Sequence, residues 1–154
     1  MKPINYIKRH KIKSAILAVL LIVYYFSLPK NLFKDPTATV ITSNNNELLG
    51  AKIADDGQWR FPETDSVPEK FKTCLLLFED EYFYNHPGFN PISIFKALKQ
   101  NISSGSVKRG GSTLTQQVIR LSRKGQSRTY LEKLKELILA TRLEFRHSKD
   151  DILK

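Results

Sequence analysis

The chain has 154 residues, which suffices for one globular domain and is too short for a large multidomain enzyme. Hydrophobic residues make up 41% and charged residues 26%, a balance that excludes wholesale disorder. The single cysteine, Cys74, excludes an internal disulfide, and no cysteine–histidine cluster indicates zinc. The net charge of +10 predicts an anionic partner, for which nucleic acid, phospholipid and a phosphorylated substrate are the candidates.

The N-terminal part has the pattern of a membrane anchor. Residues 1–13 carry five cations and no carboxylate, and residues 14–28 after them carry no charge. With Leu32 and Phe33 the apolar run extends over residues 14–33, which predicts a transmembrane helix with residues 1–13 as a cytoplasmic tail and the body outside. A cleaved signal peptide and a buried helix of a soluble protein are the alternatives, but no small-residue cleavage site follows the run.

Residues 34–65 read as a linker followed by a short β-meander. β-Branched residues at 37–42 and turn residues at 44–46 predict a first strand and a turn. The chain can return as a second strand over 47–53 and, after a turn, as a third over 58–61. A meander of this size is too small to be stable alone, and it carries no evident chemistry.

From residue 66 apolar residues recur at helical spacing, so residues 66–154 are expected to form an all-α body. Helices are predicted to begin near residues 66, 91, 112, 129 and 148, from the capping residues Ser66, Asn90, Ser112, Thr129 and Ser148. Gly105 should end the second of them. The stripes expected to face the core are Phe71, Leu75 and Phe78, then Ile94, Phe95, Leu98 and Ile102, and finally Leu131, Leu134, Ile138 and Leu143.

Three acidic residues, Glu79, Asp80 and Glu81, end the first of these helices. Glu79 lies four residues after Leu75, at the edge of the apolar stripe, where desolvation suits a carboxylate to general acid or base catalysis. A solvated helix end is the alternative. His86 follows in a segment rich in aromatic residues, where it fits a catalytic or a structural role.

Two further segments carry polar side chains in unusual density. Residues 110–117 place two glycines before a predicted helix N-terminus, where backbone N–H groups can bind an anion, but they do not form a P-loop. A plain capped helix start explains this segment about equally well. Further on, Lys133 and Glu136 are three residues apart and therefore neighbours on a helix, where an ordinary surface ion pair is the alternative reading.

Together these three segments resemble the family 51 glycosyltransferases, which are peptidoglycan polymerases. Residues 79–88 fit the first motif of that family, ED-x-x-F-x-x-H-x-G, and residues 110–117 fit the second, GGST[LI]-[TS]-x-Q. Arg128, Thr129, Lys133 and Glu136 fit the third, R-[ST]-x-x-R-K-x-x-E, in which Glu132 takes the place of the usual arginine. Residues 149–154 resemble only the beginning of the fourth motif, and residues 48–62 resemble the 1C-type class A penicillin-binding proteins.

The resemblance implies a mainly α, lysozyme-like glycosyltransferase domain, of which residues 66–154 would be the N-terminal part. It implies that lipid II is polymerised into glycan strands with release of undecaprenyl pyrophosphate, although this chain, cut inside the fourth motif, is expected to be inactive by itself. By similarity Glu79 is the general base and Glu136 the second essential carboxylate. The substrate-binding residues implied are Asp80, Phe83, His86, Gly111, Ser112, Thr113, Gln116, Gln117, Arg128 and Lys133.

The implied partners are lipid II, the growing glycan strand, the bacterial cytoplasmic membrane and other cell-wall synthesis proteins. No protein-bound metal is expected, and Mg²⁺ or Mn²⁺ is a candidate cofactor at the pyrophosphate. Nucleic acid is not an expected partner, because the anchor places the basic C-terminal region outside the cytoplasm. The alternative functions are a muramidase or lytic transglycosylase and a membrane-anchored glycan-binding or scaffold protein.

Overall fold

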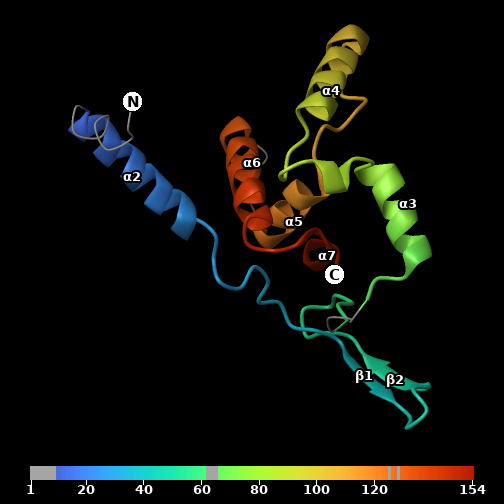
Figure 1. The fold of residues 1–154 in the computed structure, drawn as a ribbon. Helices are drawn as coiled ribbons and strands as arrows, with labels where there is room; N and C mark the ends of the chain where they lie inside the picture. The colour runs from blue at the N-terminus through green and yellow to red at the C-terminus, as the bar shows by residue number, and fades with distance from the viewer. Residues whose placement is uncertain (1–9, 62–65, 125, 128) are drawn as a thin grey trace.

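The computed structural model describes residues 10–61, 66–124, 126–127 and 129–154. Figure 1 shows α5, α6 and α7 in the middle of the molecule with α4 above them, while α2 projects to the left, α3 lies to the right and a β-hairpin projects below α3. In chain order the elements are α2 (Lys11–Phe26), β1 (Thr39–Thr42), β2 (Leu48–Lys52), α3 (Glu69–Glu79), the 3₁₀ helix η1 (Phe83–Asn85), α4 (Pro91–Ser104), α5 (Leu114–Ser122), α6 (Tyr130–Glu144) and α7 (Lys149–Leu153). The expected mainly helical body is therefore confirmed.

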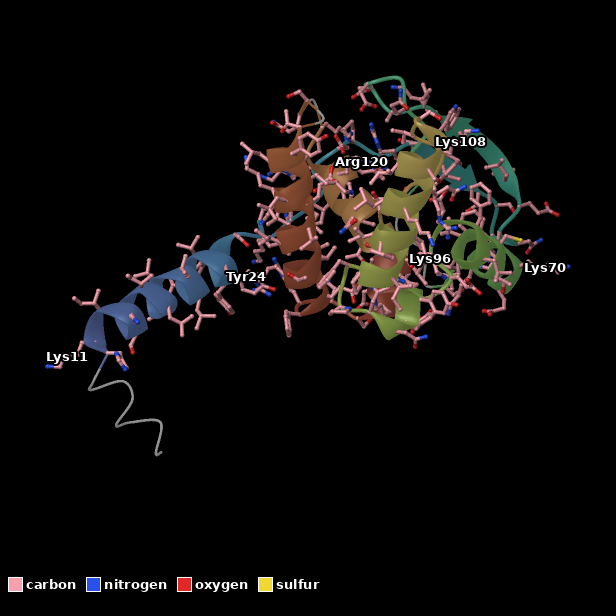
Figure 2. All side chains as sticks on the ribbon, turned by 90° about the horizontal axis from the view of Figure 1, so that it is seen from above. Lys11, Tyr24, Lys70, Lys96, Lys108 and Arg120 are labelled. Atoms are coloured by element: carbon pink, nitrogen blue, oxygen red, sulfur yellow. The ribbon has the colours of Figure 1, made fainter. Side chains whose placement is uncertain are left out.

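Helix α2 is shorter than the predicted span over residues 14–33, and it ends where the chain reaches the body. In the described ranges, no helix combines the length and the apolarity needed to cross a membrane, and α2 itself has 16 residues. Pro29 disfavours helical backbone in the residue before it, and that residue, Leu28, is buried in the core. Figure 2 shows Lys11 at the outer end of α2 and Tyr24 at the end beside the body, where the Tyr24 hydroxyl lies 3.0 Å from that of Thr141.

Strands β1 and β2 form an antiparallel hairpin, with Thr39 opposite Lys52 and an irregularity in the pairing between Ile41 and Thr42. The third predicted strand, residues 58–61, is wrong. That segment makes only isolated backbone contacts, from Ala38 N–H to the carbonyl of Arg60 and from Ala54 N–H to that of Gln58. The guanidinium of Arg60 also pairs with Asp56 at 2.7 Å, which closes a local turn instead of extending the strand.

Three of the predicted capping residues, Asn90, Thr129 and Ser148, do cap their helices, and two, Ser66 and Ser112, are not the N-caps. The amide oxygen of Asn90 accepts hydrogen bonds from the backbone of Ile92 and Ser93 at the start of α4, and Gly105 ends that helix with a φ of 64°. Ser148 caps α7, also as predicted. Ser112 does not cap α5, because Thr113 takes that place in a capping box with Gln116, and α3 begins only after Pro68.

The core is small and forms where the end of α2, α5 and α6 meet. Its buried members are Leu28, Ile119, Ala140 and Leu143. The predicted stripes on α3, α4 and most of α6 are wrong, since Phe78 is 87% exposed, Ile102 is exposed and Leu131 is 72% exposed. Helix α6 instead buries Glu132, Glu136, Ala140 and Leu143, which share one face at helical spacing.

Candidate active site

The predicted base, Glu79, is the last residue of α3, and its carboxylate faces α5. The amide nitrogen of Gln117 donates a hydrogen bond of 2.7 Å to Glu79 Oε2, across 38 positions of sequence. The Glu79 side chain is exposed, because the stripe of α3 on which its burial was predicted is exposed as well. The carboxylate is thus held by one neighbour and remains accessible to a ligand.

Asp80 and His86 are buried against each other and against the start of α5. The imidazole Nε2 lies 3.0 and 2.9 Å from the two carboxylate oxygens of Asp80, and Nδ1 accepts a hydrogen bond from the backbone N–H of Gly88. Because Nδ1 accepts, the ring proton lies on Nε2 and is donated to Asp80. Asp80 Oδ2 also accepts from the N–H of Leu114, the first residue of α5, at 3.0 Å. This geometry supports a positioning role for Asp80 and His86 rather than direct contact with the substrate. The two residues hold the loop before α4 against the N-terminus of α5.

Phe83 and Gly88 hold the same loop against α6 and α7. Phe83 is fully buried, and the ammonium of Lys149 lies 4.3 Å from the centre of its ring. Gly88 has a φ of 92°, and a Cβ there would lie 2.7 Å from the backbone carbonyl of Ala140. Lys149 further donates to the carbonyl of His86 at 2.7 Å. Phe83 is therefore part of the packing. Lys149, which the sequence placed at the beginning of the fourth motif without a role, holds the loop in position.

The glycine-rich segment before α5 approaches α4 closely. A Cβ at Gly111 would lie 3.0 Å from the Cα of Ile94, so the loop can pass α4 only without a side chain. Thr113 donates its hydroxyl hydrogen to the carbonyl of Gly88 at 2.7 Å and accepts from the N–H of Gln116 at 3.2 Å. Gly111 and Thr113 thus place the start of α5 beside the loop that carries His86.

Lys133 on α6 connects the second and third motif segments. Its ammonium donates to Ser112 Oγ at 2.6 Å, to Glu136 Oε2 at 3.2 Å and to Gln116 Oε1 at 3.4 Å. Glu136 is buried. The amide nitrogen of Gln116 is buried and has no hydrogen-bond partner within the described part of the chain. With the bond between Glu79 and Gln117, these contacts bring residues from all three motif segments into one network.

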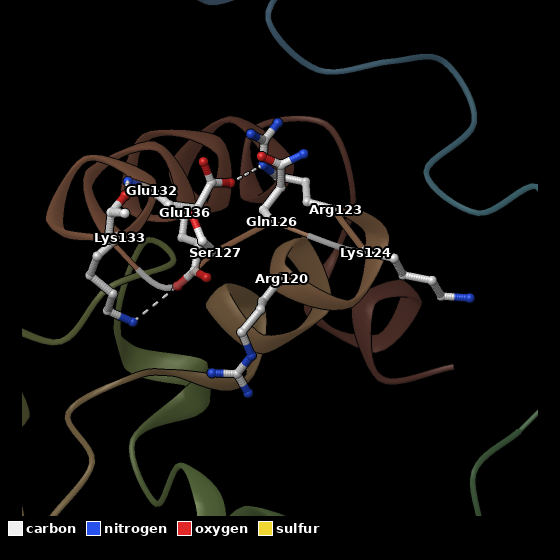
Figure 3. A pocket seen from close by; sticks show the side chains of 9 residues that line it. Arg120, Arg123, Lys124, Gln126, Ser127, Glu132, Lys133 and Glu136 are labelled. Carbon is white, nitrogen blue, oxygen red and sulfur yellow. Dashed lines mark hydrogen bonds and ion pairs between the residues drawn. The ribbon is translucent and has the colours of Figure 1, made fainter.

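A pocket of about 290 Å³ opens beside this network (Figure 3). Its lining residues are Arg120, Arg123, Lys124, Gln126, Ser127, Thr129, Glu132, Lys133 and Glu136. Four cations against two carboxylates leave a net positive lining. The ammonium of Lys124 turns away, as Figure 3 shows, and pairs with Asp35 at 2.8 Å. The predicted contact Arg128 lies outside the described residues.

Two arginines of this pocket were missed by sequence analysis. Arg120 and Arg123 follow the polar run of the second motif at a spacing of three, which is the signal that could have identified them. Arg123 pairs through Nε with the carboxylate of Glu132. This hydrogen bond and the charge of Arg123 hold the pKa of Glu132 below its usual value, and Glu132 in turn raises the pKa of Arg123. Both groups are charged at neutral pH.

No grouping of three or more histidine, cysteine, aspartate or glutamate side chains suited to a metal ion occurs among the described residues. The positively charged side chains that line the pocket are those of Arg120, Arg123, Lys124 and Lys133. Glu132 holds Arg123 in place, and Glu136 holds Lys133 in place. Such an arrangement suits an oxyanion with more than one negative charge.

The transglycosylase family model matches residues 45–154. The chain is 39% identical over 121 residues to penicillin-binding protein 1C of Escherichia coli strain K12, covering 77% of this chain and 15% of that protein. It is 35% identical over 130 residues to penicillin-binding protein 1A/1B of Bacillus subtilis strain 168, covering 83% and 14%. It is 42% identical over 93 residues to a monofunctional glycosyltransferase of Staphylococcus aureus strain JH9, covering 60% and 34%. The chain thus spans between 14% and 34% of the length of these relatives.

Proposed function

This chain belongs to the transglycosylase family of peptidoglycan glycosyltransferases, and from that premise we propose that it carries the catalytic part of a lipid II polymerase with a lysozyme-like fold. The observation that carries the proposal is the network across the three motif segments. Glu79 from the first segment is bonded to Gln117 of the second, and Lys133 of the third is bonded to Ser112 and Gln116. A carboxylate and a fixed cation are thereby both bonded to side chains at the start of α5.

Glu79 is the general base of the proposed reaction. It takes the proton from a sugar hydroxyl of the acceptor, and the freed oxygen forms a bond to the anomeric carbon of the donor from the face opposite the leaving group. The bond from that carbon to the pyrophosphate oxygen breaks, its electron pair leaves with undecaprenyl pyrophosphate, and the configuration inverts. Glu79 is accessible in the free protein, so the acceptor itself supplies the desolvation when it covers the carboxylate.

The pocket cations receive the leaving group. Arg120, Arg123 and Lys133 line one cavity, where they can neutralise the charge that develops on the pyrophosphate. Glu136 positions Lys133 at 3.2 Å, and its burial keeps that geometry defined. Mg²⁺ or Mn²⁺ bound to pyrophosphate oxygens would add to the same neutralisation.

The donor strand lies along the start of α5. Ser112, Gln116 and Gln117 present a hydroxyl and two amides there. The amide nitrogen of Gln116, which has no partner among the described residues, can donate to a ligand acceptor. Asp80, Phe83, His86, Gly111 and Thr113 act behind this surface by positioning the loop and the helix. The growing glycan and lipid II are the ligands of the site, and α2 attaches the body to the outer face of the cytoplasmic membrane.

The test is a graft. Residues 45–154 of this chain replace the matching region of the monofunctional glycosyltransferase of Staphylococcus aureus. The amount and the length distribution of the glycan strands formed from labelled lipid II are then measured. The graft should polymerise lipid II, and the same graft carrying Glu79→Gln should do so about 100-fold more slowly. Release of soluble muropeptides from purified cell wall, without strand formation, would instead identify a lytic enzyme. A folded graft that binds lipid II but forms no strands would identify a binding protein.

A further inference from the structure

The buried carboxylate of Glu132 lies in the wall of the cationic pocket. The third motif that this chain resembles has arginine at this position, so the charge contributed by α6 is reversed here. A carboxylate so close to a bound pyrophosphate would repel it. Glu132 must therefore be compensated by its surroundings, or the pocket binds anions poorly.

The compensation comes from Arg123, the residue that follows the end of α5. Its Nε donates to Glu132 Oε1, while Lys135 approaches the other carboxylate oxygen at 3.7 Å. The Glu132 side chain is 10% exposed and that of Arg123 is 31% exposed. Figure 3 shows the two groups joined at one end of the pocket and the contact between Lys133 and Glu136 at the other.

The guanidinium of Arg123 can bind Glu132 and a ligand at the same time, through different nitrogens. The group is planar, and the edge that contains Nε is occupied by Glu132, while the terminal nitrogens keep donors for a second acceptor. No hydrogen bond joins those terminal nitrogens to another residue in ranges 10–61, 66–124, 126–127 and 129–154. An oxyanion with two adjacent oxygens fits donors of this kind.

We propose that Arg123 supplies, from the end of α5, the cation that α6 lacks at position 132, and that Glu132 is the positioning residue that orients it toward a bound pyrophosphate. The inference rests on the proposed function and adds to it a residue outside the three motifs. In this chain the guanidinium lies at the end of α5 instead of at position 132 of α6. The carboxylate at position 132 accepts a hydrogen bond from that guanidinium.

The test measures binding of inorganic pyrophosphate to the 154-residue protein in detergent micelles by titration calorimetry. Arg123→Gln should weaken binding by roughly tenfold or more, because charge-assisted hydrogen bonds are lost. Lys135→Gln is the matched control: it removes the same charge, from a residue that also contacts Glu132 and does not line the pocket. It should change the affinity by less than about twofold.

A double-mutant cycle tests the positioning. Glu132→Gln should weaken binding in the wild-type background, because Arg123 loses its orienting acceptor, and should strengthen it in the Arg123→Gln background, where only repulsion is removed. Arg123→Gln alone leaves the buried carboxylate of Glu132 without its partner and could therefore unfold the protein. The double variant Arg123→Gln with Glu132→Gln removes both charges, so its pyrophosphate binding can be measured in that case. Combining Arg123→Gln with Glu132→Arg should restore affinity to within about threefold, since it returns the cation to α6.

The inference is overturned if Arg123→Gln behaves as Lys135→Gln does, if Glu132→Gln strengthens binding equally in both backgrounds, or if the wild-type protein does not bind pyrophosphate. These outcomes do not depend on polymerisation. A graft that polymerises while pyrophosphate binding ignores Arg123 refutes this inference alone. A graft that fails to polymerise, although Arg123 governs pyrophosphate binding, refutes the proposed function alone.

Discussion

The hydrogen bond from Gln117 to Glu79 joins the end of α3 to α5 and leaves the carboxylate open to solvent on its other side. An oxygen held this way can approach an incoming hydroxyl without a large rearrangement. The neighbouring acidic residues have different surroundings. Asp80 is buried by His86 and Leu114, whereas Glu81 is exposed. Three adjacent carboxylates are therefore expected to respond differently to neutralisation.

Glu79→Gln should lower lipid II polymerisation by the graft by about 100-fold, because the amide keeps the size of the side chain and cannot accept the proton. Glu81→Gln is the matched control and should retain most of the activity. Strand length and initial rate from labelled lipid II report the effect. A Glu79→Gln graft as active as its parent would remove Glu79 from the reaction.

Gly88→Ala should destabilise the fold by more than about 1 kcal/mol, because alanine is strained at a φ of 92° and its Cβ would meet the backbone of α6. Gly110→Ala serves as the control, since a Cβ there meets nothing within 4 Å. Urea denaturation in detergent compares the free energies of unfolding. Equal effects of the two substitutions would contradict the close approach of Gly88 to Ala140.

At the scale of elements, several long-range hydrogen bonds join α2 and the segment after it to α6 and the residues that follow α6. Arg142 donates to the carbonyl of Tyr25 near the end of α2 at 3.0 Å, and Arg146 donates to those of Pro29 and Lys30 at 2.8 and 2.9 Å. The last carbonyls of a helix lack partners within it, and Arg142 satisfies one of them in α2. Arg146 binds carbonyls of the segment that follows the helix. The apolar helix is thus docked on the body by side chains of α6.

Leu28→Ala should destabilise the protein by about 2–4 kcal/mol, since Leu28 belongs to the small buried core together with Ile119, Ala140 and Leu143. Leu17→Ala, on the exposed surface of α2, should change the free energy of unfolding by less than about 0.5 kcal/mol. Thermal unfolding monitored by circular dichroism gives both values. A Leu28→Ala protein as stable as the wild type would mean that the α2 junction does not contribute to the core.

The apolar side chains of α2 are exposed around the whole helix, and five cations precede the apolar run. We therefore expect α2 to reside in the membrane with its N-terminus in the cytoplasm and the body outside. Alkaline phosphatase fused after residue 66 should be active, because that enzyme works only outside the cytoplasm. Full activity of a cytoplasm-dependent reporter at the same position would reverse the expected orientation.

At the scale of the whole molecule, stability should depend on pH through paired carboxylates. Hydrogen bonds from Arg60, Arg123, Tyr84 and Ser148 are the first cause that lowers the pKa of Asp56, Glu132, Asp150 and Asp151, respectively. A carboxylate whose pKa is lower in the folded than in the unfolded state stabilises the fold at pH values above the unfolded pKa, which is about 4.3 for glutamate. This stabilisation is lost as the pH falls through the folded-state pKa. Acid should therefore destabilise the protein.

The contribution of Glu132 can be isolated by substitution. The difference in the free energy of unfolding between wild type and Glu132→Gln should shrink as the pH falls from about 6 to about 3, since protonation removes the charge that the substitution removes. A difference that stays constant over that range would show that the pairing of Glu132 with Arg123 does not contribute to stability.

Local interactions were determined by the sequence itself. Asn90 and Gly105 bound α4 and Ser148 begins α7 as predicted, because each cap contacts backbone no more than a few residues away. Family membership, predicted from three ordered motifs, follows the same logic, since the identity and spacing of residues suffice to recognise it. The chemistry assigned to Glu79 and Glu136 remains a prediction.

Only the tertiary structure decided which side of each helix faces inward. Hydrophobic periodicity predicted that Leu131 and Leu134 would be buried on α6, but both are exposed. The buried positions of α6 are Glu132, Glu136, Ala140 and Leu143, of which only Leu143 was predicted. Glu136 pairs with Lys133 of its own helix, as their spacing predicted. Glu132 is paired by Arg123 from the end of α5, and a contact between two helices is not encoded in helical spacing. In the same way α2 ends early because Leu28 finds a core formed by residues more than 90 positions away. Long-range contacts of this kind supply most of the free energy that selects a face, and a periodic pattern does not contain them.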